Sequence, residues 1–234
     1  MKKYEFTGET KTLFGVTLRR IRAVVDIKLG LFEIDAGDLG GWIEEEKNLS
    51  HEGNAWVFGD ARVFGNARVS GNARVSGNAE VFGDARVSGN AEVFGNAWVS
   101  GDARVSGNAW VSGNAEVSGN AEVFGNAWVS GDARVSGNAR VSGNAEVFGN
   151  AWVFGNAEVS KKNHILVIGP IGSRSAYTTF MLCKDNKIRV SCGCFYGTTD
   201  EFLSRIKKTH GENKYAKIYN MAVEIALVQI EDGE

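Results

Sequence analysis

The chain has 234 residues, a net charge of −2 and a hydrophobic fraction of 43%, so it can bury a sizeable core. No segment is basic enough to indicate nucleic-acid binding, and no apolar run approaches the ~18–20 residues of a membrane span. The three cysteines are sparse and odd in number, which argues against a disulfide framework and favours a cytoplasmic protein with no membrane partner.

Residues 1–52 contain short strand-like stretches ahead of the regular part of the chain. These lie at Tyr4–Phe6, Thr17–Ile27 and Leu31–Ile34, and glycines separate them. Residues 35–52 then follow the six-residue period of the next segment only loosely. We expect an irregular first coil here, and we expect the preceding strands to cap its open edge.

Eighteen consecutive six-residue units fill residues 53–160 without a gap. Each reads Gly-(Asn/Asp)-Ala-x-Val-(Ser/Phe), where x is Trp, Arg or Glu. Gly and Asn suit a tight corner, and the last three positions alternate as in a strand. Hexapeptide repeats indicate a parallel β-helix, so three units should form one triangular coil of 18 residues with valine inside. The pattern resembles left-handed hexapeptide coils, and the expected handedness comes from that resemblance.

Taking every eighteenth residue as one face places most aromatic residues on two faces of the predicted coil and a column of arginines on the third. Large apolar patches usually mark interfaces, so we expect a homo-oligomer, with a trimer favoured by analogy with the fold. The alternatives are that flanking segments cover the aromatic residues, or that repeat duplication spread them without selection for a partner. The residues predicted to form the interface are Trp56, Phe58, Phe94, Trp98, Trp110, Trp128, Phe148 and Trp152.

Catalysis is the less favoured interpretation of the repeats. Acyl transfer from a thioester, a common activity of hexapeptide coils, needs a general base that is usually histidine. No unit contains His, Lys or Tyr, and no loop interrupts the coil to build a pocket, while His51 and His164 lie at its two ends. The sequence therefore favours a non-catalytic protein without a cofactor over an acyltransferase.

Residues 161–234 have a different composition and predict a small α+β domain. Strands are expected at His164–Ile168, Tyr177–Lys184 and Lys187–Phe195, the last two joined as a hairpin. A capping box at Thr198–Glu201 then opens a helix, and a second amphipathic helix follows it.

The turn at residues 169–174 is the strongest candidate for a binding site. Its sequence, Gly-Pro-Ile-Gly-Ser-Arg, offers backbone amides, a hydroxyl and a guanidinium close together, which suits an anionic group such as phosphate. On this interpretation the ligand-binding residues are Ser173, Arg174, Tyr177 and His210. A tight interstrand loop with an exposed arginine is the preferred interpretation of the same turn.

The cysteines offer a second, weaker candidate. Cys192 and Cys194 are expected on one face of a strand, with Cys183 on the partner strand, so that zinc with His210 as fourth ligand is conceivable. Buried, reduced cysteines that act as small hydrophobic residues are the preferred interpretation, and we expect no metal.

Three segments of the N-terminal flank resemble the lead-in of phage- and prophage-encoded hexapeptide-repeat proteins. These are Tyr4–Thr10, Ala36–Glu44 and Asn48–Asn54, and in the tail Ile171–Arg174 and Cys192–Phe195 resemble the C-terminal domain of the same group. Members of that group are often described as polymer-forming or, by analogy, as acyltransferases. The resemblance implies the fold, a viral or prophage origin and therefore the host bacterial cytoplasm, but no settled activity.

Taken together, the sequence predicts a mainly β protein in three parts: an N-terminal β cap at 1–52, the repeat β-helix at 53–160 and the α+β domain at 161–234. The predicted function is a structural or binding protein, in which the coil is a rigid scaffold and the C-terminal domain recognises a host protein. The alternative is sequestration of a small anionic ligand or nucleotide signal of host defence by that domain.

Overall fold

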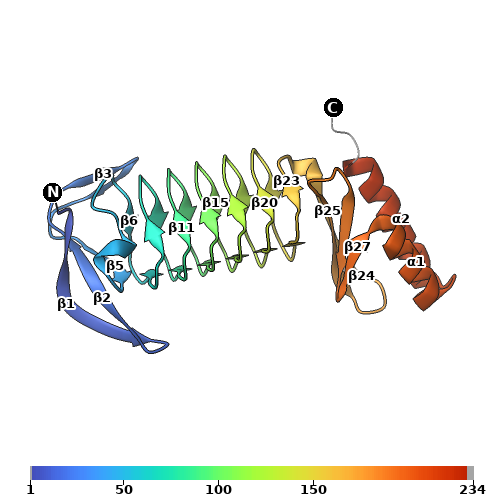
Figure 1. Cartoon of the computed structure of the whole chain (residues 1–234), viewed down its shortest axis with the longest axis horizontal. Helices are drawn as coiled ribbons and strands as arrows, with labels where there is room; N and C mark the ends of the chain where they lie inside the picture. Colours follow the sequence, from blue (N-terminus) through green and yellow to red (C-terminus); the bar gives the residue numbers. More distant parts are fainter. Residues whose placement is uncertain (1, 231–234) are drawn as a thin grey trace.

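The computed structural model describes residues 2–230 and shows an elongated rod (Figure 1). Two β-hairpins lie at one end of the rod, a stack of triangular coils forms its shaft, and a sheet with two helices closes the other end. The three parts follow one another along the long axis in the order of the sequence.

The N-terminal end is built from two hairpins and one connecting strand. β1 (Tyr4–Leu13) pairs with β2 (Val16–Ala23), and β3 (Ile27–Leu29) pairs with β4 (Phe32–Ile34), both antiparallel. β5 (Leu39–Ile43) pairs with β2 on one side and, in parallel, with a strand of the shaft on the other. The 3-10 helix η1 (Glu46–Asn48) follows and leads into the repeats. β5 therefore extends the stack of parallel strands ahead of the six-residue units.

Each six-residue unit contributes one two-residue strand, formed by the variable residue and the valine. These strands are β6 (Trp56–Val57), β7 (Arg62–Val63), β8 (Arg68–Val69), β9 (Arg74–Val75), β10 (Glu80–Val81), β11 (Arg86–Val87), β12 (Glu92–Val93), β13 (Trp98–Val99), β14 (Arg104–Val105), β15 (Trp110–Val111), β16 (Glu116–Val117), β17 (Glu122–Val123), β18 (Trp128–Val129), β19 (Arg134–Val135), β20 (Arg140–Val141), β21 (Glu146–Val147), β22 (Trp152–Val153) and β23 (Glu158–Val159).

Every third strand pairs in parallel, so the shaft has three sheets and a register of 18 residues. Trp110 lies opposite Trp128 and Val111 opposite Val129, as an example of a register repeated along the whole shaft. We call the sheet from β6 to β21 the first face, the sheet from β7 to β22 the second face and the sheet from β8 to β23 the third face. The predicted parallel β-helix and the sorting of residues into three faces are confirmed.

The valines and alanines of the repeats form the core of the shaft. All of them are buried, with at most 1% of their surface exposed. Burying a valine stabilises a fold by roughly 1.5–3 kcal/mol, so this column is the main stabilising feature of each coil. At the corners, asparagine amides of successive coils donate to one another, as from Asn90 to Asn108 and from Asn108 to Asn126.

The N-terminal segment covers the first coil, as expected from the sequence. The Nζ of Lys3 donates to the carbonyl oxygens of Ala55 at 2.7 Å and Gly53 at 3.3 Å, which would otherwise be unpaired at the open edge. Tyr4 packs edge-on against Trp56, whose side chain is completely buried. The prediction that Trp56 is an exposed interface residue is therefore wrong, because the chain's own N-terminus covers it.

The C-terminal unit is an antiparallel meander with two helices on one side. Its strands are β24 (Ile165–Ile171), β25 (Ala176–Leu182), β26 (Ile188–Cys192) and β27 (Phe195–Thr198), preceded by the 3-10 helix η2 (Lys162–His164). α1 (Thr199–His210) begins with the predicted capping box of Thr198 and Glu201, and α2 (Lys214–Ile230) runs back beside it. Among residues 2–230, no helix is long and apolar enough to cross a membrane.

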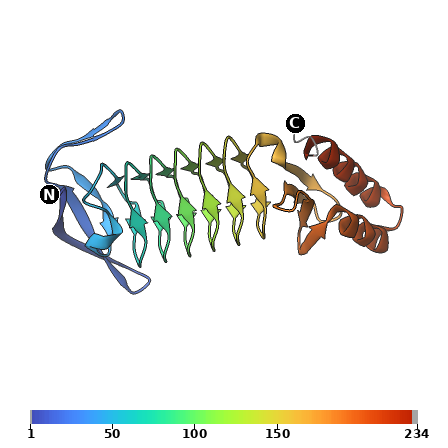
Figure 2. The ribbon, with the colours of Figure 1, turned by 45° about the horizontal axis from the view of Figure 1, so that its top comes forward.

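The C-terminal sheet lies between the shaft and the two helices (Figure 2). Phe180 and Val190 pack against the helices, whereas Met181 and Cys183 join the core that continues from the shaft. The backbone N–H of Trp152 donates to Thr179 Oγ1 at 3.1 Å, and this hydrogen bond connects the last coil to the sheet. The shaft and the sheet therefore share a packed interface.

Candidate functional site

A hollow of about 390 Å³ opens at the end of the C-terminal sheet that faces away from η2. It lies where the β24–β25 loop, the β26–β27 loop and the last turns of α1 meet. We call it the basic pocket and define it by Ser173, Arg174, Arg205, Thr209, His210 and Tyr219.

The β24–β25 loop, residues 172–175, forms one wall of the basic pocket and carries Ser173 and Arg174. The N–H of Ser175 donates to the carbonyl of Gly172 at 3.4 Å, which closes the loop. Gly172 has a φ of +73°, and a Cβ at this position would overlap the hydroxyl of Tyr219. Glycine is therefore required for the loop to approach α2 this closely.

α1 forms the opposite wall. Arg205 and Thr209 are four residues apart and so lie on the same side of the helix. His210 follows in the last turn, and its ring lies 5.9 Å from the ring of Tyr219 on α2. The pocket thus combines side chains from a loop and two helices.

Tyr219 places a protonated hydroxyl in the basic pocket. Its oxygen lies 3.9 Å from the Sγ of Cys192. Burial, with the neighbouring Cys192 thiol as the second cause, raises the pKa of Tyr219 to about 12. The hydroxyl therefore keeps its proton at neutral pH and can donate a hydrogen bond.

The basic pocket is lined by positively charged side chains and by none that is negatively charged. Arg174 and Arg205 line it, and no Asp or Glu is among its lining residues. Within the described chain, neither guanidinium forms an ion pair. Both arginines are exposed, and a wall that carries charge of one sign attracts ions of the opposite sign, here anions.

The structure brings together three of the four residues predicted to bind a ligand. Ser173, Arg174 and His210 line the basic pocket, whereas Tyr177 does not. Tyr177 lies beside Gly169 and shares its side of β25 with Thr179, which contacts the shaft. Sequence reasoning missed Arg205 and Tyr219, although the helical spacing of Arg205 to Thr209 and His210 was a usable signal.

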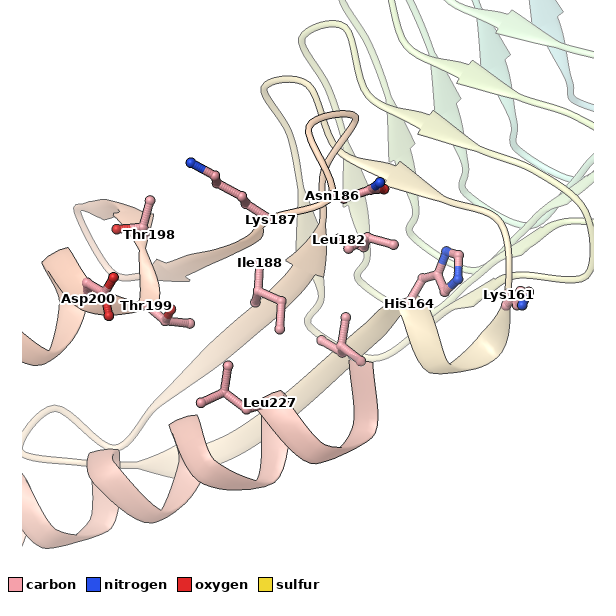
Figure 3. Close-up of a pocket in the computed structure, with 11 residues that line it drawn as sticks. Lys161, His164, Leu182, Asn186, Lys187, Ile188, Thr198, Thr199, Asp200 and Leu227 are labelled. Atoms are coloured by element: carbon pink, nitrogen blue, oxygen red, sulfur yellow. The ribbon is translucent and has the colours of Figure 1, made fainter. Parts of the chain in front are cut away.

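A second hollow, of about 750 Å³, lies at the opposite end of the C-terminal sheet (Figure 3). Lys161 and His164 line it on the side of the shaft, and Asp200 lines it at the start of α1. Ile230, the last residue that the structure describes, also lines this hollow. We assign it no function.

His164 joins the last coil to this second hollow. Its Nδ1 accepts a hydrogen bond from the backbone N–H of Ser160 at 3.3 Å. Burial, followed by the nearby charge of Lys161, lowers the pKa of His164 below its ordinary value of 6.5. The neutral imidazole is therefore the form that the fold favours.

The three cysteines do not converge. Cys183 is buried beside the last coil, Cys192 lies against Tyr219, and Cys194 is exposed in the β26–β27 loop. The expectation that Cys192 and Cys194 share one face of a strand is wrong, because β26 ends at Cys192. Over residues 2–230 no group of three His, Cys, Asp or Glu side chains is placed to hold a metal ion.

The aromatic residues of the shaft divide into covered and exposed groups. Phe58 is half-buried beside Phe32, and Phe64 stacks on Phe82 beneath the β1–β2 hairpin. The alternative in which flanking segments cover aromatic residues therefore holds near the N-terminal end. The predicted interface residues that remain exposed are Trp98, Trp110, Trp128, Phe148 and Trp152, while Phe94 is half-buried.

Three aromatic side chains form a continuous column on the first face. Trp110 and Trp128 have 42% and 44% of their surface exposed, and their rings meet edge to face at 5.9 Å. Phe94 meets Trp110 in the same way at 6.2 Å. We call Phe94, Trp110 and Trp128 the aromatic column.

Comparison with known proteins bears on the shaft. Residues 61–77, 67–83, 85–101, 97–113 and 133–147 match the sequence family described as the YdcK beta solenoid repeat. A search of curated proteins found no match to the chain. The shaft is thus similar in sequence to the YdcK beta solenoid repeat, in agreement with its stacked parallel coils.

Proposed function

We propose that the protein is a rigid scaffold, in which the shaft holds the C-terminal unit at a fixed distance and angle from the N-terminal hairpins. The observation that carries this proposal is the continuity of the three parallel sheets. No unit between residues 53 and 160 is longer or shorter than six residues, so no loop interrupts the shaft. In this proposal the C-terminal unit is the part of the protein that recognises a partner.

The hydrogen bonds between coils support a stiff shaft. Trp110 N–H donates to the carbonyl of Ala127 at 2.9 Å, and Asn108 N–H donates to that of Gly125 at 2.7 Å, with the same pattern in neighbouring coils. Each coil contacts only its neighbours, so bending the shaft would break a ladder on one face.

The junction with the C-terminal unit supports a fixed angle. Lys184 N–H donates to the carbonyl of Asn156 at 3.2 Å, in addition to the contact of Trp152 with Thr179. Because Met181 and Cys183 are buried in the same core as the last coils, the unit is packed onto the shaft and does not hang on a linker.

The distance between the ends of the shaft tests this proposal. Spin labels at exposed residues Asp60 and Lys208, in a background with Cys183, Cys192 and Cys194 replaced, should give one narrow distance distribution by pulsed electron paramagnetic resonance. Removing the 18 residues 101–118, one full coil, should keep the distribution narrow and displace it toward shorter distances, because coils are about 4.8 Å apart. A broad distribution in the full-length protein would contradict a rigid scaffold.

Self-association through the first face is a second candidate property. The aromatic column supports it, because Trp110 and Trp128 are held in a fixed arrangement on a flat sheet and are exposed. Analogy with the fold favours a trimer. In such an assembly the shafts would lie side by side, and each copy would present its own C-terminal unit.

A further inference from the structure

We infer that the basic pocket binds a small phosphate monoester, with Arg174 and Arg205 as the two residues that hold the phosphate. This site is independent of the scaffold proposal, because all of its lining residues belong to the C-terminal unit. The inference rests on where the two guanidiniums lie, on what surrounds them and on the size of the hollow.

The two arginines come from opposite walls. Arg174 is in the β24–β25 loop and Arg205 is on α1, and both line one hollow. The Nη1 of Arg174 lies next to Gly193, which has no side chain to block it and has a φ of +59° in the β26–β27 loop. A guanidinium offers parallel N–H donors that match two oxygens of a phosphate, so two guanidiniums on opposite walls can bind one phosphate group between them.

Neutral donors complete the surroundings. Ser173, Thr209 and Tyr219, each of which carries a hydroxyl, line the same hollow, and the Tyr219 hydroxyl lies against Gly172. No carboxylate among the lining residues competes with an anion. A phosphate monoester uses up to three oxygens as acceptors, which fits a pocket that holds donors and no acidic group.

The size of the pocket selects a small molecule. Its volume of about 390 Å³ falls in the range of roughly 300–1,000 Å³ that small-ligand sites occupy. The rings of Phe202, His210 and Tyr219 line part of it and can pack against an organic group. A ligand that joins a phosphate to a small planar group therefore fits better than a peptide.

Titration calorimetry at low ionic strength tests the inference on the full-length protein, with AMP and inorganic phosphate as probes and adenosine as the uncharged comparison. We expect AMP and inorganic phosphate to bind and adenosine to bind far more weakly. Arg174→Ala and Arg205→Ala should each weaken AMP binding by about tenfold to a hundredfold, the usual effect of losing a hydrogen-bonded charge. Arg174→Lys should fall between wild type and alanine, because it keeps the charge and loses the paired donors.

Arg86→Ala is the matched control, since it removes the same charge from an exposed position on the third face. It should bind AMP as the wild-type protein does. Thermal unfolding of each variant shows that it is folded before binding is measured. Absence of binding of both phosphate probes to the wild-type protein would overturn the inference, as would equal affinity in the wild-type, Arg174→Ala and Arg205→Ala proteins, or an equal loss in Arg86→Ala.

Discussion

Most corners of the shaft depend on a glycine that meets two requirements at once, a positive φ and close approach to the next coil. Gly113 has a φ of +70°, a conformation that side chains rarely adopt, and a Cβ there would lie 2.9 Å from the backbone nitrogen of Gly131 in the next coil. Gly149, in the last coil, has a φ of +66° but no heavy atom within 4 Å of such a Cβ. Comparing substitutions at these two glycines therefore separates the energetic cost of backbone strain from the cost of close contact between coils.

Alanine substitutions at these two glycines should therefore differ in effect. We expect Gly149→Ala to lower the free energy of unfolding by about 1–2 kcal/mol, the cost of a left-handed residue with a side chain. Gly113→Ala should lower it by about 2–5 kcal/mol, because overpacking against the next coil adds to that cost. Urea unfolding followed by circular dichroism measures both, and equal losses would show that coil stacking does not restrict the corner.

His164 should make the last coil sensitive to acid. Because burial lowers its pKa in the folded protein, the unfolded chain takes up a proton first as the pH falls below 6.5. The contribution of neutral His164 is therefore complete above pH 6.5 and is lost below it, where a proton on Nδ1 also prevents acceptance from Ser160. The melting temperature of wild type should fall between pH 7 and pH 5.5 more steeply than that of His164→Asn, whose amide oxygen remains an acceptor. Parallel curves would exclude this role.

The residues of the shaft could be predicted because each unit carries its own pattern. Valine and alanine are inside and glycine is at the corner wherever the unit occurs, so eighteen copies support one interpretation. Trp56 was beyond this reasoning, because its burial depends on Tyr4, which lies outside the repeats. The helical spacing of Arg205 to Thr209 was visible in the sequence, but the place of Arg205 in the same hollow as Arg174 depends on how α1 packs on the sheet.

At the scale of elements, alternation explains why Tyr177 and Phe180 behave differently. Phe180 faces the helices, whereas Thr179 and Met181 face the shaft or its core. Tyr177 is two residues from Thr179 and therefore lies on the shaft side of β25, away from the basic pocket. The strand was predicted correctly, but the side that its helices cover could not be read from the strand alone.

The aromatic column belongs to a single face, and its removal tests self-association. Trp110→Ser with Trp128→Ser should lower the molar mass measured by light scattering, because both side chains are exposed in the single chain. The control pair is Arg86→Ser with Arg104→Ser, at the equivalent position of the third face. An unchanged mass in the tryptophan variant, or the same change in the arginine variant, would exclude the aromatic column as the interface.

For the whole molecule, the number of units determines the angle between the two ends. Three units complete one coil, so eighteen units bring the C-terminal unit back to the orientation set by the first one. Deletion of the six residues 113–118 should turn that unit by about a third of a revolution and move Trp128 away from the face of Trp110. This variant is the matched control for the 18-residue deletion. With the labels at Asp60 and Lys208, the two deletions should give different distances, and identical ones would show that the angle is not fixed.

The shaft has a practical chemical property that follows from its uninterrupted repeats. No lysine occurs between residues 53 and 160, whereas lysines occur in both flanks, from Lys2 to Lys47 and from Lys161 to Lys217. Reagents that acylate primary amines can therefore modify side chains only near the tips. Attached to an activated bead or glass slide, the molecule would be held by an end and its long sides would remain untouched by the coupling.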